Sequence, residues 1–178
     1  MPIIMIVSAF AALVSSGGAP RASICMGKQE DEAAEQILGN CFTLQIVVSI
    51  VLTAILQIRG KDLLLAFGAS ENTIRYATDY MHIYAFGTLF VQLTLGMNSF
   101  ITAQGFTTIS MVSVVIGALC NIILDPIFIF AFHMGVKGAA LATILSQAVS
   151  TIWVIRFLCG NKTQIHLRRK YMRLQPKV

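Results

Sequence analysis

The chain has 178 residues, of which 56% are hydrophobic and only 12% are charged. Soluble domains have about 25% charged residues and about 45–50% apolar residues. A soluble fold of this composition would lack the polar surface needed to cover it, and the same composition excludes intrinsic disorder. The composition therefore predicts an integral membrane protein that resides in a lipid bilayer. The formal net charge is +5. Whether this charge indicates a nucleic-acid partner depends on where the charged residues lie in the sequence.

Five apolar segments follow one another along the chain. A helix needs about 20 mostly apolar residues to cross the hydrocarbon core of a bilayer. The segments near that length are residues 2–20, 37–58, 82–104, 109–132 and 138–159. None has the two-residue alternation of a membrane β-strand. The sequence predicts an all-α integral membrane protein with about five transmembrane helices. The first segment has no basic region before it, which disfavours a signal peptide.

The basic residues indicate an orientation. If the five segments all cross, nine of the 13 Lys and Arg residues fall on one side and four (Arg59, Lys61, Arg75, Lys137) on the other. An excess of Lys and Arg marks the cytoplasmic side. We therefore expect a multi-pass protein of the plasma (inner) membrane with a cytoplasmic C-terminus, and a basic cytoplasmic tail at residues 161–178. These basic residues form no aromatic-interleaved module, so nucleic acid is not an expected partner.

This orientation leaves the N-terminus outside, next to an apolar run and without an export signal. A preceding helix would remove the difficulty. We therefore expect the sequence to come from within a longer protein.

The connections between the segments are short or polar. Residues 26–36 predict a cytoplasmic turn and a helix start, with acidic residues where the helix dipole favours them. We expect these acids to form a solvated face and not a metal site. Residues 59–80 are predicted to form a long outer connection, in which Ser70 caps a helix that begins near Glu71. The four cysteines form no CxxC pair, so they predict packing and no metal site.

Polar and small residues recur every three or four positions in four of the segments, so each helix has one polar face. Two interpretations are open: close packing between helices, or a shared water-filled cavity. The number of amide side chains favours a cavity, although both can hold on different parts of each face. The recurring residues are Gln45, Ser49, Thr53 and Gln57; Tyr80, Tyr84, Gly87, Thr94, Asn98 and Thr102; Ser110, Ser113, Gly117, Asn121 and Asp125; and Ala139, Thr143, Ser146 or Gln147, and Ser150 or Thr151.

Asp125 is the only acidic residue in the four segments after the first. An ionised carboxylate is expensive in hydrocarbon, so it is expected to face a partner or water. Asn121 lies one turn earlier on the same face. Pro126 removes a backbone donor and clashes with the carbonyl of Ile122, which predicts a helix kink. Together these groups could hold a proton or Na⁺. The alternative is that Asp125 lies near the outer surface and only satisfies a bent helix end.

The run Asn121-Ile-Ile-Leu-Asp125-Pro126-Ile-Phe, followed by Gly135-Val-Lys-Gly138-Ala-Ala, resembles the multidrug and toxin extrusion (MATE) family of cation-coupled efflux transporters. Residues 97–105 are similar to the end of that family's fourth helix. Residues 21–33 are similar to the connection between its second and third helices. The resemblance covers nearly the whole chain.

The resemblance implies a twelve-helix, two-lobed transporter fold, in which residues 1–160 are helices two to six of the N-terminal lobe. The first helix and the C-terminal lobe would then be expected in the full-length protein. It also implies a cation-coupling network, which matches Asp125, Asn121, Thr143 and Tyr80, with Tyr84 as a less close match for the tyrosine. From the polar faces, the expected substrate cavity includes Tyr84, Asn98 and Gln147.

The function expected from these features is secondary active efflux. Drugs, organic cations or other lipophilic small molecules would leave in exchange for H⁺ or Na⁺, with no other cofactor. No nucleophile–base pair or phosphate-binding glycine loop points to an enzyme. One alternative is a lipid-linked-sugar flippase of the same superfamily, which should have a more cationic cavity. Another is a non-transporting membrane fragment or assembly subunit. The substrate and the coupling ion stay open.

Overall fold

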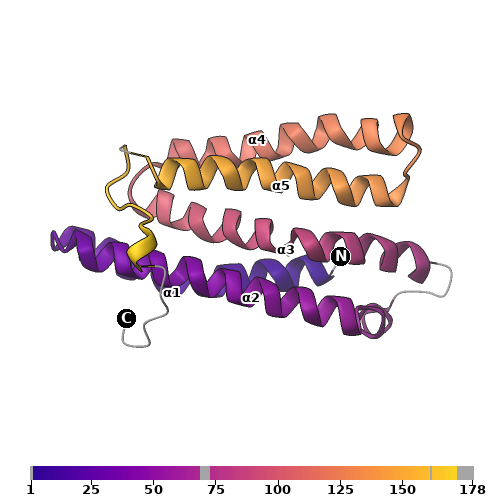
Figure 1. Cartoon of the computed structure of the whole chain (residues 1–178), viewed down its shortest axis with the longest axis horizontal. Helices are drawn as coiled ribbons and strands as arrows, with labels where there is room; N and C mark the ends of the chain where they lie inside the picture. Colours follow the sequence, from indigo (N-terminus) through magenta and orange to yellow (C-terminus); the bar gives the residue numbers. More distant parts are fainter. Residues whose placement is uncertain (1, 69–72, 161, 172–178) are drawn as a thin grey trace.

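The computed structural model describes residues 2–68, 73–160 and 162–171, and these residues fold into a bundle of long α-helices (Figure 1). No strand occurs in the described ranges, which confirms the predicted all-α class. The five helices are α1 (Pro2–Gly27), α2 (Asp31–Ala66), α3 (Ile74–Ala103), α4 (Thr107–Pro126) and α5 (Val136–Leu158). A π-helical turn, η1 (Ile127–Ala131), follows α4, and a short 3₁₀ turn, η2 (Arg169–Tyr171), follows α5.

Helix α3 is the centre of the bundle. Helices α1 and α2 pack on one side of it, and α4 and α5 lie on the other (Figure 1). Among the described residues, four helical stretches are long and apolar enough to cross a membrane: Ile3–Gly27, Asp31–Ala66, Thr107–Ala131 and Val136–Leu158. Helix α3 is also long, with 30 residues, but it is more polar than these four. Its neighbours shield it from lipid, so its polar groups bond to other helices and not to hydrocarbon.

Helix α2 is longer than the predicted segment. Its 36 residues would extend about 54 Å as one straight helix, well beyond the ~30 Å of a hydrocarbon core. Figure 1 shows that the end of α2 turns out of line with the rest of the helix. The uncharged part lies between Glu35 and Arg59, and charged residues occupy both ends. The prediction of a long outer connection over residues 59–80 is wrong, because α2 runs to Ala66 and α3 begins at Ile74. The predicted cap at Ser70 and the helix start at Glu71 lie outside the described residues.

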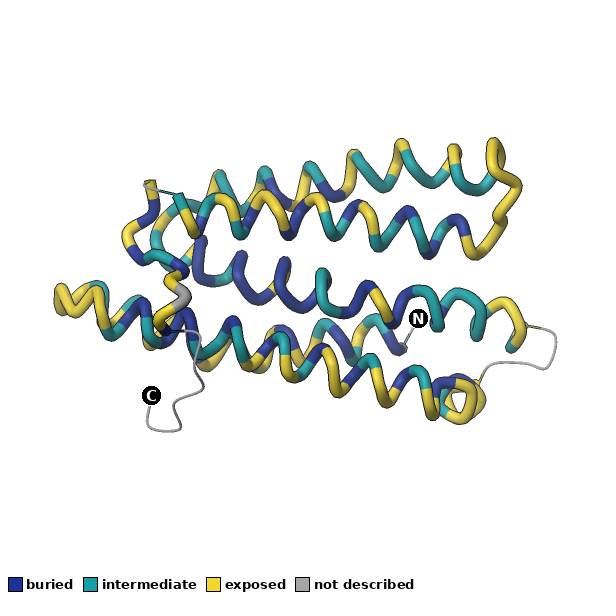
Figure 2. Tube along the Cα trace, viewed as in Figure 1, coloured by how far each residue is buried: buried dark blue, intermediate teal, exposed yellow. Residues whose placement is uncertain are grey.

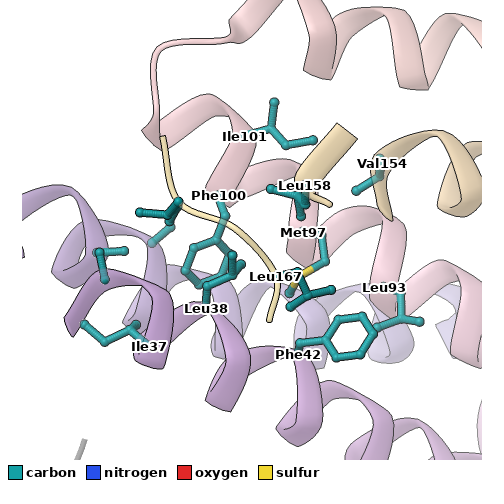
Figure 3. Close-up of a cluster of buried hydrophobic side chains, with 14 residues drawn as sticks. Ile37, Leu38, Phe42, Leu93, Met97, Phe100, Ile101, Val154, Leu158 and Leu167 are labelled. Atoms are coloured by element: carbon teal, nitrogen blue, oxygen red, sulfur yellow. The ribbon is translucent and has the colours of Figure 1, made fainter. Parts of the chain in front are cut away.

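The bundle has two apolar clusters, one toward each end. The larger lies where α1, α3 and α5 end and α2 and α4 begin, which we call the basic end; Figure 3 shows its side chains. Phe100, Leu38, Met97 and Leu158 are fully buried there. Toward the other end, which we call the outer end, α1 begins beside Leu56, Leu64, Met81 and Tyr84. These clusters join α1, α2 and α3 along their lengths, whereas only Ser113 and Gly117 of α4 are buried (Figure 2).

Residues 162–171, which we call the clasp, return from α5 across the basic end. Ile165 is fully buried in the larger apolar cluster, and Leu167 joins it there. Oε1 of Gln104, in the turn after α3, accepts the backbone N–H groups of Gln164 (3.0 Å) and Ile165 (3.2 Å). The described part of the predicted tail is therefore packed against the helices.

Two acidic residues of α2 hold the end of the clasp. Oε1 of Glu35 accepts the backbone N–H of His166 at 3.1 Å, and Oε2 lies 3.2 Å from Nε of Arg168. The hydroxyl of Tyr171 donates to Oε1 of Glu32 at 2.6 Å. The expectation of a fully solvated acidic face is wrong for Glu35, which is only 6% exposed. Its partners come from a segment more than 130 positions later in the chain, which local patterning does not reveal.

Candidate functional site

The polar face of α2 is used for packing against α3. Oγ1 of Thr53 donates to the carbonyl of Ala85 at 2.9 Å, and Nε2 of Gln57 donates to that of His82 at 3.0 Å. The side chain of Gln45 is fully buried against Gly96, where a Cβ would collide with it. The bonds of Thr53 and Gln57 support the packing interpretation for their part of this face, whereas neither polar atom of the buried Gln45 amide has a hydrogen-bond partner.

The polar faces of α3, α4 and α5 meet in a second network. Nδ2 of Asn98 donates to Oγ of Ser113 at 2.7 Å, and Oγ of Ser150 donates to the carbonyl of Ser113 at 2.9 Å. Farther along α3, the hydroxyls of Thr94 and Thr151 lie 2.7 Å apart. These bonds tie the three helices together at one wall of a cavity.

This cavity, which we call the polar cavity, has a volume of about 210 Å³ and lies between α3, α4 and α5. Its walls combine apolar surface with six polar side chains, three of which are amides. They consist of Thr94, Leu95, Asn98, Val114, Gly117, Ala118, Asn121, Ser146, Gln147 and Ser150. The structure thus brings together Asn98, Asn121 and Gln147, which the polar faces singled out. Here the cavity interpretation applies.

Asn121 and Asp125 each have a buried polar atom without a partner. Nδ2 of Asn121 and Oδ1 of Asp125 are both shielded from solvent, and neither has a hydrogen-bond partner. Buried polar groups are nearly always satisfied, so each such atom marks a place where a partner is missing. The two residues lie one turn apart on α4, and Asn121 lines the polar cavity.

The packing of α4 on α5 sets the level of Thr143 along the bundle relative to this pair. A Cβ on Gly117 would meet Ser150, and one on Gly138 would meet the backbone of Phe128. These two approaches fix an antiparallel register in which Asp125 is level with Ala142. The hydroxyl of Thr143 donates to the carbonyl of Ala139 at 2.9 Å, which leaves its oxygen able to accept another bond. Thr143 therefore lies at about the same level along the bundle as Asp125, about one to two turns from the outer end.

Pro126 follows Asp125 and ends the regular part of α4. The next turn is the π-helical η1, closed by a bond from the Phe132 N–H to the Ile127 carbonyl (3.0 Å). Such a turn is common at functional sites. It lies directly beyond the unpartnered carboxylate.

Tyr80 and Tyr84 lie elsewhere on α3. Their rings stack with centroids 5.8 Å apart. Tyr84 is only 3% exposed and packs in the apolar cluster with Ile3 and Leu64, and Tyr80 packs against that cluster. The structure therefore groups both tyrosines with α1 and α2, and neither lines the polar cavity. Their functional roles stay predictions.

Within the described ranges, no three His, Cys, Asp or Glu side chains are grouped closely enough to hold a metal ion. Asp125, Asn121 and Thr143 offer oxygen atoms of the kind that binds a proton or a hard monovalent cation. These membrane-length helices, with a polar cavity and an unpartnered carboxylate inside the bundle, define a multi-pass helical membrane protein of the transporter type.

Comparison with known proteins identifies the family. The sequence profile of the MatE family matches residues 1–127, and the chain belongs to this family of multidrug efflux transporters. It is similar to the multidrug export protein MepA of Staphylococcus haemolyticus, with 30% identity over 164 residues that make up 92% of this chain and 36% of the relative. MepA of Staphylococcus saprophyticus is 23% identical over 97% of this chain and 38% of its own length. These relatives are exporters by name, a class distinct from enzymes.

Solved structures show the same fold. An inward-facing multidrug resistance MATE transporter superposes with a TM-score of 0.92 at 24% identity, covering 99% of this chain and 40% of that one. An outward-facing MATE transporter gives a TM-score of 0.90. The chain thus spans about 36–40% of the length of the relatives that it matches.

Proposed function

We propose that these five helices act in a secondary active antiporter that exports lipophilic or cationic small molecules in exchange for H⁺ or Na⁺. The family membership and the names of the multidrug export relatives support this proposal. So does the polar cavity at the contact of α3, α4 and α5. In this proposal Asn98 and Gln147 contact the exported molecule inside that cavity.

The observation that carries the coupling mechanism is the unpartnered Oδ1 of Asp125 beside the unpartnered amide of Asn121. A buried carboxylate oxygen without a hydrogen-bond partner in a membrane-length helix is costly, so a bound proton or Na⁺ would stabilise the structure around it. In this proposal Thr143, which lies at about the same level on α5, supplies a further oxygen. Cation binding and release then shift the balance between inward- and outward-open states, because the two states differ in cation affinity. Tyr80, which the resemblance also assigns to this network, stays a prediction.

The test is efflux of a fluorescent cationic dye from cells that produce the native gene product, before and after dissipation of the H⁺ or Na⁺ gradient. We expect Asp125→Asn and Asn121→Ala to lose the gradient-dependent efflux. The matched control is Asp79→Asn, because Asp79 is an acidic residue of the outer end whose Oδ2 pairs with Lys137 at 3.5 Å. Gradient-dependent efflux at the wild-type rate in the Asp125 variant would remove Asp125 from the mechanism.

The cavity chemistry separates this proposal from its alternatives. A flippase for lipid-linked sugars should have a cationic cavity, but none of the residues that line the polar cavity is Lys or Arg. A non-transporting fragment or assembly subunit predicts that the wild-type protein gives no efflux above cells without the gene. That outcome would overturn the transport proposal itself.

We further propose that the basic end faces the cytoplasm of the cell across the plasma membrane. Arg21, Lys28, Arg156, Lys162 and Arg168 lie at this end. The outer end has Arg59, Lys61, Arg75 and Lys137. The larger number of basic residues at the basic end supports a cytoplasmic position for the end of α5 and for the clasp.

A further inference from the structure

A second hollow of the molecule lies between α1 and α2, away from the polar cavity. This groove, which we call the α1–α2 groove, has a volume of about 400 Å³. Its lining is apolar except at one end, and consists of Leu13, Val14, Gly17, Gly18, Arg21, Ile37, Asn40, Cys41 and Leu44. The α1–α2 groove is therefore apolar along most of its length and has polar groups at the basic end.

Gly17 keeps the α1–α2 groove open. A Cβ on Gly17 would meet no atom within 4 Å, so this position borders empty space. One residue later the helix is tightly packed, since a Cβ on Gly18 would collide with Cys41 and Phe100. Leu13 is 68% exposed and Leu44 40% exposed along the sides of the groove. Exposed apolar side chains of this kind are complementary to the hydrocarbon chains of lipids.

Arg21 supplies the charge at the basic end of the groove. It is exposed, and no acidic side chain in the described ranges forms an ion pair with it. It lies six residues before the end of α1 at Gly27, which is about 9 Å along the helix axis. From that depth a long basic side chain extends toward the headgroup layer, where its partner is a phosphate. An unpaired guanidinium above an apolar slot is complementary to an anionic lipid.

We propose that the α1–α2 groove binds an anionic phospholipid, with its phosphate at Arg21 and one acyl chain along the groove over Gly17. Basic pockets between transmembrane helices bind such headgroups in other membrane proteins. A cationic exported molecule does not fit, because Arg21 would repel it. A free phosphate ion would leave the apolar part of the groove unfilled. The site is separate from the polar cavity, and its test measures lipid retention instead of efflux.

The first test is native mass spectrometry of the native gene product purified in mild detergent and mixed with equal amounts of phosphatidylglycerol and phosphatidylcholine. We expect the wild type to retain phosphatidylglycerol preferentially. Arg21→Gln should abolish that preference. Gly17→Leu, whose Cβ would meet no atom within 4 Å, should fill part of the groove and reduce retention of both lipids. The control is Arg156→Gln, since Arg156 is an exposed basic residue at the same end but on α5, outside the groove.

Circular dichroism of each variant establishes that the helices are intact. An Arg21 variant with wild-type lipid preference would overturn the proposal. An equal loss of preference in the Arg156 variant would also overturn it. That result would indicate that the basic residues of this end attract anionic lipids in general, with no specific site at Arg21.

The second test identifies what occupies the groove in the native membrane. Photoreactive benzoylphenylalanine replaces Leu13 on the wall of the groove and is activated by light in cell membranes. The mass of the crosslinked adduct is then measured by mass spectrometry. A mass increase equal to a phospholipid supports the proposal. A polypeptide adduct would overturn it, because it would show that another protein segment covers the groove.

Discussion

At the scale of single residues, Glu35 shows how one buried carboxylate organises a long-range contact. It is only 6% exposed, yet it lies within the first turns of α2, where acidic residues are usually solvated. The backbone N–H of His166, the ring of the same residue (3.4 Å) and the guanidinium of Arg168 all approach it. One acidic side chain thus binds the clasp by a backbone hydrogen bond and by charge.

Glu35→Gln is expected to destabilise the protein by about 1–2 kcal/mol. Glutamine can still accept the backbone bond from His166, but it loses the charge that pairs with Arg168. The effect stays modest because the Arg168 side chain is 60% exposed and water screens the pair. The measurement is thermal unfolding in detergent. Asp31→Asn is the control, since Asp31 lies one turn earlier and is exposed; equal losses in both variants would contradict a specific role for Glu35.

Tyr171 gives the clasp a dependence on alkaline pH. Its hydrogen bond to Glu32 raises the pKa of the phenol, and the charges of Glu32 and Glu35 act in the same direction. A group whose folded pKa is raised contributes stability below its unfolded pKa, which is about 10 for tyrosine, and loses that contribution as the pH rises further. We expect hydrogen exchange of residues 162–171 to accelerate above about pH 10 beyond the intrinsic increase. In Tyr171→Phe this additional increase should vanish; if it persists, another group is responsible.

At the scale of helices, the close approach of α5 to η1 depends on Gly138. A Cβ at this position would lie 2.8 Å from the backbone carbon and oxygen of Phe128, and backbone atoms cannot rotate away. The contact lies one turn beyond Asp125 toward the outer end, so it also fixes how closely α5 approaches this part of α4.

Gly138→Val should therefore push α5 away from η1 and destabilise the pair by about 1–3 kcal/mol. The expected result is a lower unfolding temperature together with weaker gradient-dependent dye efflux. Gly27→Ala is a suitable control, because a Cβ there meets nothing within 4 Å. If the Gly138 variant unfolds at the wild-type temperature, α5 and η1 can move apart without loss of stability.

At the scale of helices, some features of the fold could be predicted from the sequence and others could not. Apolar length and the absence of alternation predicted five helices, because these properties depend on each segment alone. The extent of α2 was underestimated, since its ends contain charged residues that leave the hydrocarbon while the helix continues to Ala66. The position of Tyr84 could not be deduced from helical spacing: α3 is 30 residues long, and different parts of one face meet different neighbours.

The clasp contains an alternating pattern of buried residues that is easily overlooked among its basic residues. Its basic residues indicated a solvated tail, but Thr163, Ile165 and Leu167 alternate with more exposed neighbours and are all buried. Alternation over three residue pairs is typical of an extended segment on a surface. The partners of this segment, Gln104 and Glu35, lie in other helices, so only the fold brings them together.

At the scale of the whole molecule, the five helices divide the charges into two groups. The longest uncharged runs lie between the two ends of the bundle, and Asp125 is the only acidic residue between them. An otherwise uncharged slab of this kind matches the hydrocarbon core of a bilayer. The unequal numbers of basic residues at its two faces then favour one orientation in the membrane.

This asymmetry predicts a cytoplasmic C-terminus. A green fluorescent protein fused there should fluoresce in a bacterial host, whereas alkaline phosphatase fused at the same position should be inactive, because it folds only after export. Changing Lys28, Arg156 and Lys162 together to Gln removes three charges from the basic end and should raise phosphatase activity. The matched control changes Arg59, Lys61 and Arg75 of the outer end to Gln, which strengthens the bias and should leave the phosphatase inactive. An active phosphatase on the unmodified chain would reverse the assignment, and the clasp would then lie outside the cell.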